Sequence, residues 1–109
     1  MISYEDFKKL EIKIGKIISA EKIPDTDKLL LLKVDFAEES PRQIVSGIAE
    51  KFPDPLSLVG LKCAFAANLP PRTIRGYESQ GMILAVGGVD SPFSLLEVDK
   101  SAKEGSLVR

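Results

Sequence analysis

The chain has 109 residues, 44% of them hydrophobic, and this length predicts a single domain over residues 1–109 with a buried core. The formal net charge of -1, from 15 basic and 16 acidic residues, excludes a surface that is basic all over. There is no histidine, and the one cysteine, Cys63, lies in an apolar run. We expect no catalytic site, no metal site and no cofactor, because the usual acid, base, nucleophile and zinc-ligand sets are missing.

The apolar segments of this chain are all short. None approaches the roughly 20 residues that span a bilayer, and residues 1–20 lack the apolar core of a signal peptide. A single cysteine within an apolar run is typical of a small core residue in a reducing compartment. We therefore expect a soluble, cytoplasmic protein.

The N-terminal residues predict a short helix followed by a strand. Ser3 is placed to cap a helix that carries Tyr4, Phe7 and Leu10 at helical spacing. A helix this short is unstable alone, so it should dock on its own barrel or on a partner subunit. Alternating β-branched residues over 11–18 predict the first strand, with a bulge or sharp bend at Gly15.

Further apolar runs predict the remaining strands. They cover residues 28–36, 42–46, 61–67 and 82–86, with another candidate strand over 94–98. Between residues 48 and 59, Pro53 and Pro55 limit the chain to small helical turns. Five or six short strands with a helical insertion after the third fit an all-β, five-stranded oligonucleotide-binding (OB-fold) barrel with an N-terminal helix.

A polar loop joins the apolar runs 61–67 and 82–86. It carries Asn68, Arg72, Arg75, Ser79 and Gln80, without a carboxylate pair or a histidine. Arginines beside amides and hydroxyls are suited to holding phosphate and ribose oxygens rather than to breaking bonds. The loop therefore predicts nucleic-acid binding.

Each loop residue also has a structural interpretation. The arginines could be solvated, and Asn68 and Ser79 could bond the loop's own backbone instead of a ligand. Among the aromatic residues, Tyr77 is the one we expect to stack on bases, whereas Phe36 and Phe65 fit the core.

The order of motifs along the chain resembles a known family. Matches run from Tyr4 through Gly15 to Gly105, and the densest lie in the segment 68–82. The chain resembles the tRNA-binding domain found at the C-terminus of methionyl-tRNA synthetases, as a separate synthetase beta subunit, and in free-standing dimeric tRNA-binding proteins. The resemblance implies an OB-fold barrel that recognises tRNA by shape, with little reading of sequence. It also implies a homodimer built by the N-terminal segment and the C-terminal extension, and the synthetase's catalytic chain as a further partner.

The same resemblance implies roles for single residues. Arg75 and Lys28 would contact phosphates, Asn68 and Ser79 would hold the loop or reach ribose hydroxyls, and Met82 would line the groove floor or the core. Two departures are Pro70 and Thr73, which stand where many relatives carry lysines. With the strand lysines and the other loop residues added, the predicted tRNA-binding set is Lys16, Lys28, Lys33, Asn68, Arg72, Arg75, Tyr77, Ser79, Gln80 and Met82.

A second function is compatible with the same barrel. A related secretion-chaperone branch resembles the domain in its overall pattern, and it suggests a protein-binding dimer with a chaperone-like or scaffolding role. The combination of Asn68, Ser79 and Met82 discriminates against that alternative, because the chaperone branch lacks it. The sequence therefore favours a non-catalytic tRNA-binding module.

Overall fold

The computed structural model describes all residues from Met1 to Arg109. No helix in it is long and apolar enough to cross a membrane. The elements are mostly short strands, with one α-helix and two 3-10 helices. In chain order they are α1 (Tyr4–Lys9), β1 (Ile12–Lys22), β2 (Leu30–Asp35), β3 (Arg42–Ser46), η1 (Ala49–Lys51), η2 (Pro55–Leu58), β4 (Lys62–Ala66), β5 (Arg72–Ile74), β6 (Tyr77–Ser79), β7 (Met82–Ile83), β8 (Ala85–Val86) and β9 (Ser94–Leu95).

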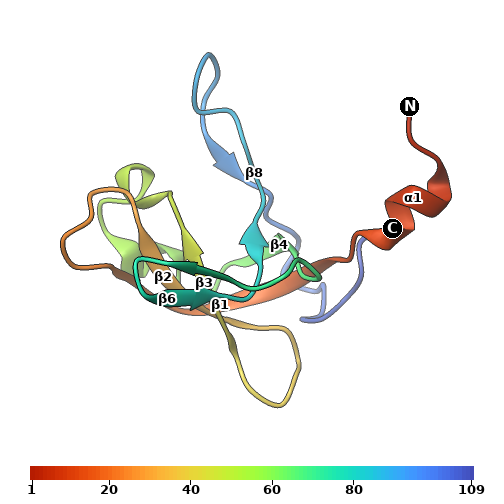
Figure 1. Cartoon of the computed structure of the whole chain (residues 1–109), viewed down its shortest axis with the longest axis horizontal. Helices are drawn as coiled ribbons and strands as arrows, with labels where there is room; N and C mark the ends of the chain where they lie inside the picture. The colour runs from red at the N-terminus through yellow and green to blue at the C-terminus, as the bar shows by residue number, and fades with distance from the viewer.

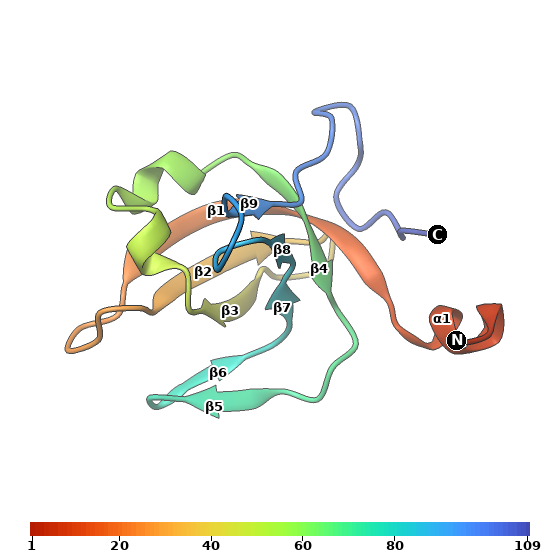
Figure 2. The ribbon, with the colours of Figure 1, turned by 90° about the horizontal axis from the view of Figure 1, so that it is seen from above.

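Five strands form one antiparallel sheet in the order β3-β2-β1-β4-β7. The sheet curls into a half-barrel, and its two edge strands, β3 and β7, come into contact. Two small hairpins, β5–β6 and β8–β9, extend from it, and Figure 2 shows β5 and β6 lying beyond β3 and β7. The expected five-stranded, OB-like barrel is therefore confirmed.

The main core lies inside the curled sheet. Strand β2 alternates, so that Leu30, Leu32 and Val34 face this core and are fully buried. Phe36 and Phe65 meet edge to face there, with ring centroids 5.3 Å apart. Each fully buried aliphatic or aromatic side chain of this kind contributes about 1.5–3 kcal/mol to folding.

Cys63 belongs to the same core and is fully buried, as expected. Burial raises the pKa of its thiol to about 11, and the negative charge of Glu97 adds to the effect. The thiol is therefore neutral at physiological pH, and its contribution is that of a small apolar side chain.

A second, smaller cluster lies on the other side of the sheet. Ile23, Leu31 and Val45 are buried there. Ile74 and Tyr77 of the β5–β6 hairpin pack against them. The hairpin thus covers a face of the sheet that would otherwise be exposed and apolar.

The N-terminal helix forms where the sequence predicts it. The Ser3 hydroxyl accepts a hydrogen bond from the Asp6 backbone N–H at 3.1 Å, which satisfies one of the free donors of the first turn. No residue of α1 is buried. Figure 1 shows α1 projecting from the barrel at the end where the C-terminus also lies.

The first strand differs from its prediction in two ways. It continues to Lys22, and its irregularity falls between Ile17 and Ser19, so the expectation of a bulge at Gly15 was wrong. Gly15 has a different physical role, because a Cβ there would clash with Cγ1 of Val34 and lie 2.8 Å from Cε1 of Phe36. The glycine lets the Phe36 ring pack directly against the strand backbone.

The predictions for the C-terminal half need three corrections. The polar loop 67–82 contains the β5–β6 hairpin, which the sequence interpretation missed. The run 82–86 is divided at Leu84 into β7 and β8, and the segment 94–98 contributes only the two residues of β9 and an isolated bridge from Glu97 to Cys63. In the N-terminal half, the second strand begins at Leu30, two residues later than expected.

Candidate nucleic-acid interface

The β5–β6 hairpin presents its arginines through a tight turn. Arg72 pairs with Ser79 and Ile74 with Tyr77, so the connecting loop is only Arg75 and Gly76. Both turn residues have positive φ, 53° and 85°, the geometry that matches a two-residue turn to the twist of its strands. Glycine adopts this conformation freely, whereas Arg75 does so at a cost of roughly 1 kcal/mol. Arg75 therefore stands exposed at the hairpin tip.

Tyr77 and Ile74 anchor the hairpin. These cross-strand neighbours turn their side chains toward the second cluster, and both are only half-buried. The Tyr77 side chain consequently packs against the protein in part and is accessible in part. Stacking of a base on the remaining surface of this ring stays a prediction.

Ser79 and Gln80 fasten the base of the hairpin to β3. The buried Ser79 hydroxyl accepts from the Val45 N–H at 3.0 Å and donates to the Gly81 carbonyl at 3.0 Å. The Gln80 side-chain oxygen accepts from the Gln43 N–H at 2.9 Å, and the Gln80 N–H donates to the Gln43 carbonyl at 2.8 Å. The hydroxyl and the amide oxygen are thus already engaged within the protein.

Asn68 joins the start of the loop to the N-terminal segment. Its side-chain oxygen accepts from the Glu11 N–H at 2.8 Å, and its amide nitrogen donates to the Lys9 carbonyl at 2.7 Å. Of the two interpretations left open by the sequence, the structure shows backbone bonding. The partners, however, lie at the end of α1 rather than in the loop itself.

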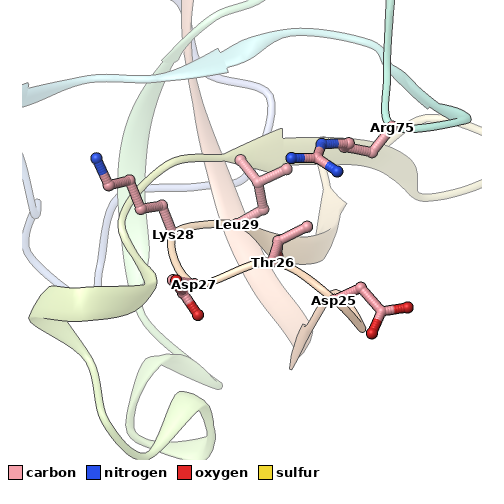
Figure 3. A pocket seen from close by; sticks show the side chains of 6 residues that line it. All are labelled: Asp25, Thr26, Asp27, Lys28, Leu29 and Arg75. Atoms are coloured by element: carbon pink, nitrogen blue, oxygen red, sulfur yellow. The ribbon is translucent and has the colours of Figure 1, made fainter.

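Arg72, Arg75 and Lys28 are exposed cations without an acidic partner. Arg75 and Lys28 line one surface pocket of about 390 Å³, together with residues of the turn before β2. In Figure 3 the Arg75 guanidinium extends toward Leu29, while the carboxylates of Asp25 and Asp27 point away from it. The structure therefore brings two predicted phosphate-binding residues together from segments about fifty positions apart in sequence.

The remaining strand lysines lie at different places. The Lys33 ammonium donates to the Gln43 side-chain oxygen at 2.9 Å, and the Gln43 amide donates to the Glu78 carbonyl at 2.9 Å, which puts Lys33 at the foot of the hairpin. Lys16 lies opposite Asp35 on the sheet, and the pKa of Glu104 is lowered by a backbone hydrogen bond, by Lys62 and, to a smaller extent, by the charge of Lys16. Lys16 is thus near the C-terminal segment and lines neither hairpin pocket.

Met82 borders a smaller hollow on the other flank of the hairpin. Its side chain is 49% exposed, so it belongs to the surface rather than to the core. The hollow is lined by Val45, Leu69, Pro70, Arg72, Ile74, Ser79, Gly81 and Met82.

Arg42 is a site residue that the sequence interpretation missed. One guanidinium nitrogen donates to the carbonyls of Ala67 at 2.6 Å and Gln80 at 3.2 Å, which lie at the two ends of the loop. The other nitrogens donate to both carboxylate oxygens of Glu38 at 2.8 Å. The same guanidinium lies 5.2 Å from the centroid of the Phe36 ring. Glu38 stands four residues before Arg42, but no local sequence pattern indicates the two distant carbonyls.

The Glu38–Arg42 pair changes the titration of both groups. The hydrogen bond from Arg42 holds the pKa of the Glu38 carboxyl below its usual range, although partial burial opposes the effect. The reciprocal hydrogen bond raises the pKa of Arg42. Arg42 is therefore a structural cation, in contrast to the unpaired Arg72 and Arg75.

A curled five-stranded antiparallel sheet with a mid-chain helical insertion and a basic hairpin beside its edge defines an OB-type nucleic-acid-binding module. Residues 12–107 match the family described as "Putative tRNA binding domain". The chain belongs to this family and is a tRNA-binding domain.

The similar curated proteins are methionine–tRNA ligases. The enzyme of Methanoregula boonei is 50% identical over 109 residues, which are 100% of this chain and 16% of the ligase. That of Methanosarcina mazei is 42% identical over 109 residues, again 100% of this chain and 15% of the ligase. The chain thus spans only a small part of the length of these relatives.

Solved structures show the same fold over the whole chain. A methionyl-tRNA synthetase related protein from Pyrococcus horikoshii is 38% identical, with a TM-score of 0.91 and coverage of 100% of this chain and 98% of that one. The chaperone CsaA of Bacillus anthracis is 26% identical, with a TM-score of 0.86 and coverage of 100% and 99%. The family match and the ligase relatives favour tRNA binding over the chaperone-like alternative.

Proposed function

We propose that this domain binds folded tRNA by its shape, through the β5–β6 hairpin and the turn that precedes β2, with little reading of sequence. The observation that carries the proposal is the division of labour among the polar side chains. Ser79, Gln80 and Asn68 are engaged in holding the loop. Arg75 and Lys28 line one pocket together with Asp25 and Asp27, yet neither cation forms an ion pair, and unpaired cations are what a phosphate backbone requires.

The residues divide into phosphate contacts and positioning residues. Arg75, Arg72 and Lys28 would bind phosphates, and Lys33 would add positive charge at the foot of the hairpin. Lys16, near the C-terminal segment, would contact tRNA only outside the hairpin. Arginine is suited to the tip position because its planar guanidinium can give two parallel hydrogen bonds to one phosphate.

We further propose that the domain is a non-catalytic module. As an appended domain, a beta subunit or a free-standing protein, it would raise the local concentration of tRNA for the catalytic chain of a methionyl-tRNA synthetase. The relationship to methionine–tRNA ligases supports this partner. The cytoplasmic location expected from the sequence stays a prediction.

Two copies of the chain would form a homodimer through the end of the molecule that carries both termini. A groove of about 210 Å³ lies there between α1 and the C-terminal segment, and five of its seven lining residues are hydrophobic. Tyr4, which lines the groove, is largely exposed, as are Met1 and Ile2 just before it in the sequence. A dimer would bury this apolar surface and present two basic hairpins to one curved tRNA.

Replacement of the tip arginine tests the proposed site. Arg75→Ala should weaken tRNA binding by roughly 1–3 kcal/mol, because it removes a charged phosphate contact, and should leave the fold intact. Lys100→Ala is the matched control, since it removes one exposed positive charge away from the hairpin. Filter-binding titrations with unfractionated tRNA measure both variants. Unchanged affinity of a folded Arg75→Ala protein would contradict the site.

A further inference from the structure

The hollow beside Met82 combines an apolar surface with a single cation. Leu69 is 40% exposed and Met82 is 49% exposed, and Val45 and Ile74 extend the apolar lining beneath them. Arg72 is the only charged residue of the lining. We call this hollow, lined by the eight residues named above, the Met82 pocket.

Apolar side chains next to an unpaired arginine match the two halves of a nucleotide. A nucleobase has an apolar face that loses contact with water when it lies on Leu69 and the polarisable thioether of Met82. Arg72 has no acidic partner within this protein, and the phosphate attached to the same nucleotide carries the negative charge that would pair with it. The positive charge of Arg72 therefore favours a nucleotide over an apolar peptide as the ligand of this pocket.

The Ser79 hydroxyl, which lines the pocket, has already used its one proton. The Ser79 hydroxyl both accepts from the Val45 N–H and donates to the Gly81 carbonyl. It has no proton left to read the edge of a base. Contact in this pocket would consequently tolerate any base, because every base offers a flat face.

The size of the pocket sets a condition on the ligand. Its volume is about 80 Å³, so it receives only part of a base lying across its mouth. A base can lie there only after it has left its own stack. A continuous duplex offers no such base, whereas the loops of a folded tRNA do.

We propose that the Met82 pocket seats one unstacked nucleobase of the tRNA, with Arg72 on the adjoining phosphate. This inference rests on the proposed function, which it deepens by naming an unpaired nucleotide as the ligand of the second pocket. Binding would then combine backbone contacts at Arg75 and Lys28 with sequence-tolerant base contact at Leu69 and Met82.

The chain is suited to a direct spectroscopic test because Met1 and Met82 are its two methionines. Labelling with [¹³C-methyl]methionine gives two signals, and Met82→Gln assigns them. Addition of a tRNA transcript should shift the Met82 methyl upfield through the ring current of the base. A blunt-ended duplex RNA of similar length should bind more weakly and leave that signal in place.

Affinity measurements supply a second, independent readout. Met82→Gln and Leu69→Gln should each bind tRNA roughly five- to tenfold more weakly, because apolar contact is lost, with an unchanged dependence on salt. The matched control is Leu56→Gln, whose side chain is 70% exposed on η2. Thermal unfolding of each variant verifies that it is folded.

The outcomes separate the two proposals. If tRNA binds but the Met82 methyl does not shift and Met82→Gln binds as well as the parent, the base pocket is overturned while the proposed function stands. An equal methyl shift with duplex RNA also overturns it, because no unstacked base is then required. If the parent protein fails to bind tRNA at low salt, the proposed function itself fails.

Discussion

Arg42 and Arg75 illustrate how the partners of an arginine decide its role. Arg42 donates to two backbone carbonyls and to both oxygens of Glu38, so it is committed to the fold. Arg75 has no such partner and is exposed at the hairpin tip. The same chemical group thus secures the loop in one position and is available for a ligand in the other.

Loss of the Arg42 contacts should destabilise the domain and loosen the loop. Arg42→Met keeps much of the apolar stem but leaves the Ala67 and Gln80 carbonyls and Glu38 without their donor, so the free energy of unfolding should fall by roughly 1–3 kcal/mol. Arg72→Met should change it by no more than about 0.5 kcal/mol, because the Arg72 side chain is exposed and unpaired. Urea unfolding compares the two. Equal stability of both variants would show that Arg42 does not hold the loop.

The Glu38–Arg42 pair also predicts a dependence of stability on pH. The pKa of Glu38 is lowered on folding by the hydrogen bond from Arg42, so the pair stabilises the fold above the unfolded pKa of ~4.3. This contribution is lost as the pH falls through the lower, folded pKa. Urea unfolding between about pH 2 and 7 should show a smaller acid loss of stability in Glu38→Gln than in the parent. Identical pH profiles of the two proteins would show that the Glu38–Arg42 pair does not contribute to stability.

At the scale of elements, α1 and the β5–β6 hairpin both depend on contacts outside themselves. Helix α1 has six residues and no buried side chain, and the hairpin strands have three residues each. Neither is stable in isolation. The second cluster holds the hairpin, and Asn68 ties the end of α1 to the loop.

Removal of residues 1–10 should loosen the dimer. The truncation deletes one wall of the apolar groove that the proposed interface uses, including Tyr4, Phe7 and Leu10. Sedimentation velocity should then show a larger share of monomer at equal concentration. Leu56→Gln is again a suitable control, because it alters an exposed apolar residue away from both termini. A truncated chain that remains as dimeric as the parent would place the interface elsewhere.

The sequence predicts the elements that carry their own pattern. Strand β3 and the Ser3 cap of α1 lie where the residues indicate, because a short apolar run and a capping serine are local signals. The β5–β6 hairpin is different, since its strands contain Arg72, Thr73 and Glu78 and resemble a solvated loop. Its stability comes from packing of Ile74 and Tyr77 on residues far along the chain.

For the candidate site, too, the sequence predicts only what residue type and local pattern indicate. The sequence indicates the exposed cations Arg72 and Arg75, because residue type alone suggests a role for them. It gives no sign of Arg42, whose carbonyl partners are 25 and 38 residues away. The sequence also does not reveal that Lys16 lies outside both hairpin pockets, because its position depends on how the sheet curls.

For the whole molecule, local arrangement compensates for the lack of positive charge. The net charge is -1, yet the hairpin carries two unpaired arginines and Lys28 lies across a pocket from one of them. With so few phosphate contacts, one domain should bind weakly and lose affinity as salt rises. Shape and the second copy in a dimer would supply the remaining affinity.

The measurement that tests this account most directly is a titration of the intact protein with folded tRNA, beside single-stranded RNA and duplex DNA of similar length, at about 50 and 200 mM salt. We predict that folded tRNA binds more tightly than either competitor and that its affinity falls steeply between the two salt concentrations. Equal affinity for all three nucleic acids, or no binding of tRNA at the lower salt, would contradict recognition of tRNA shape by this domain.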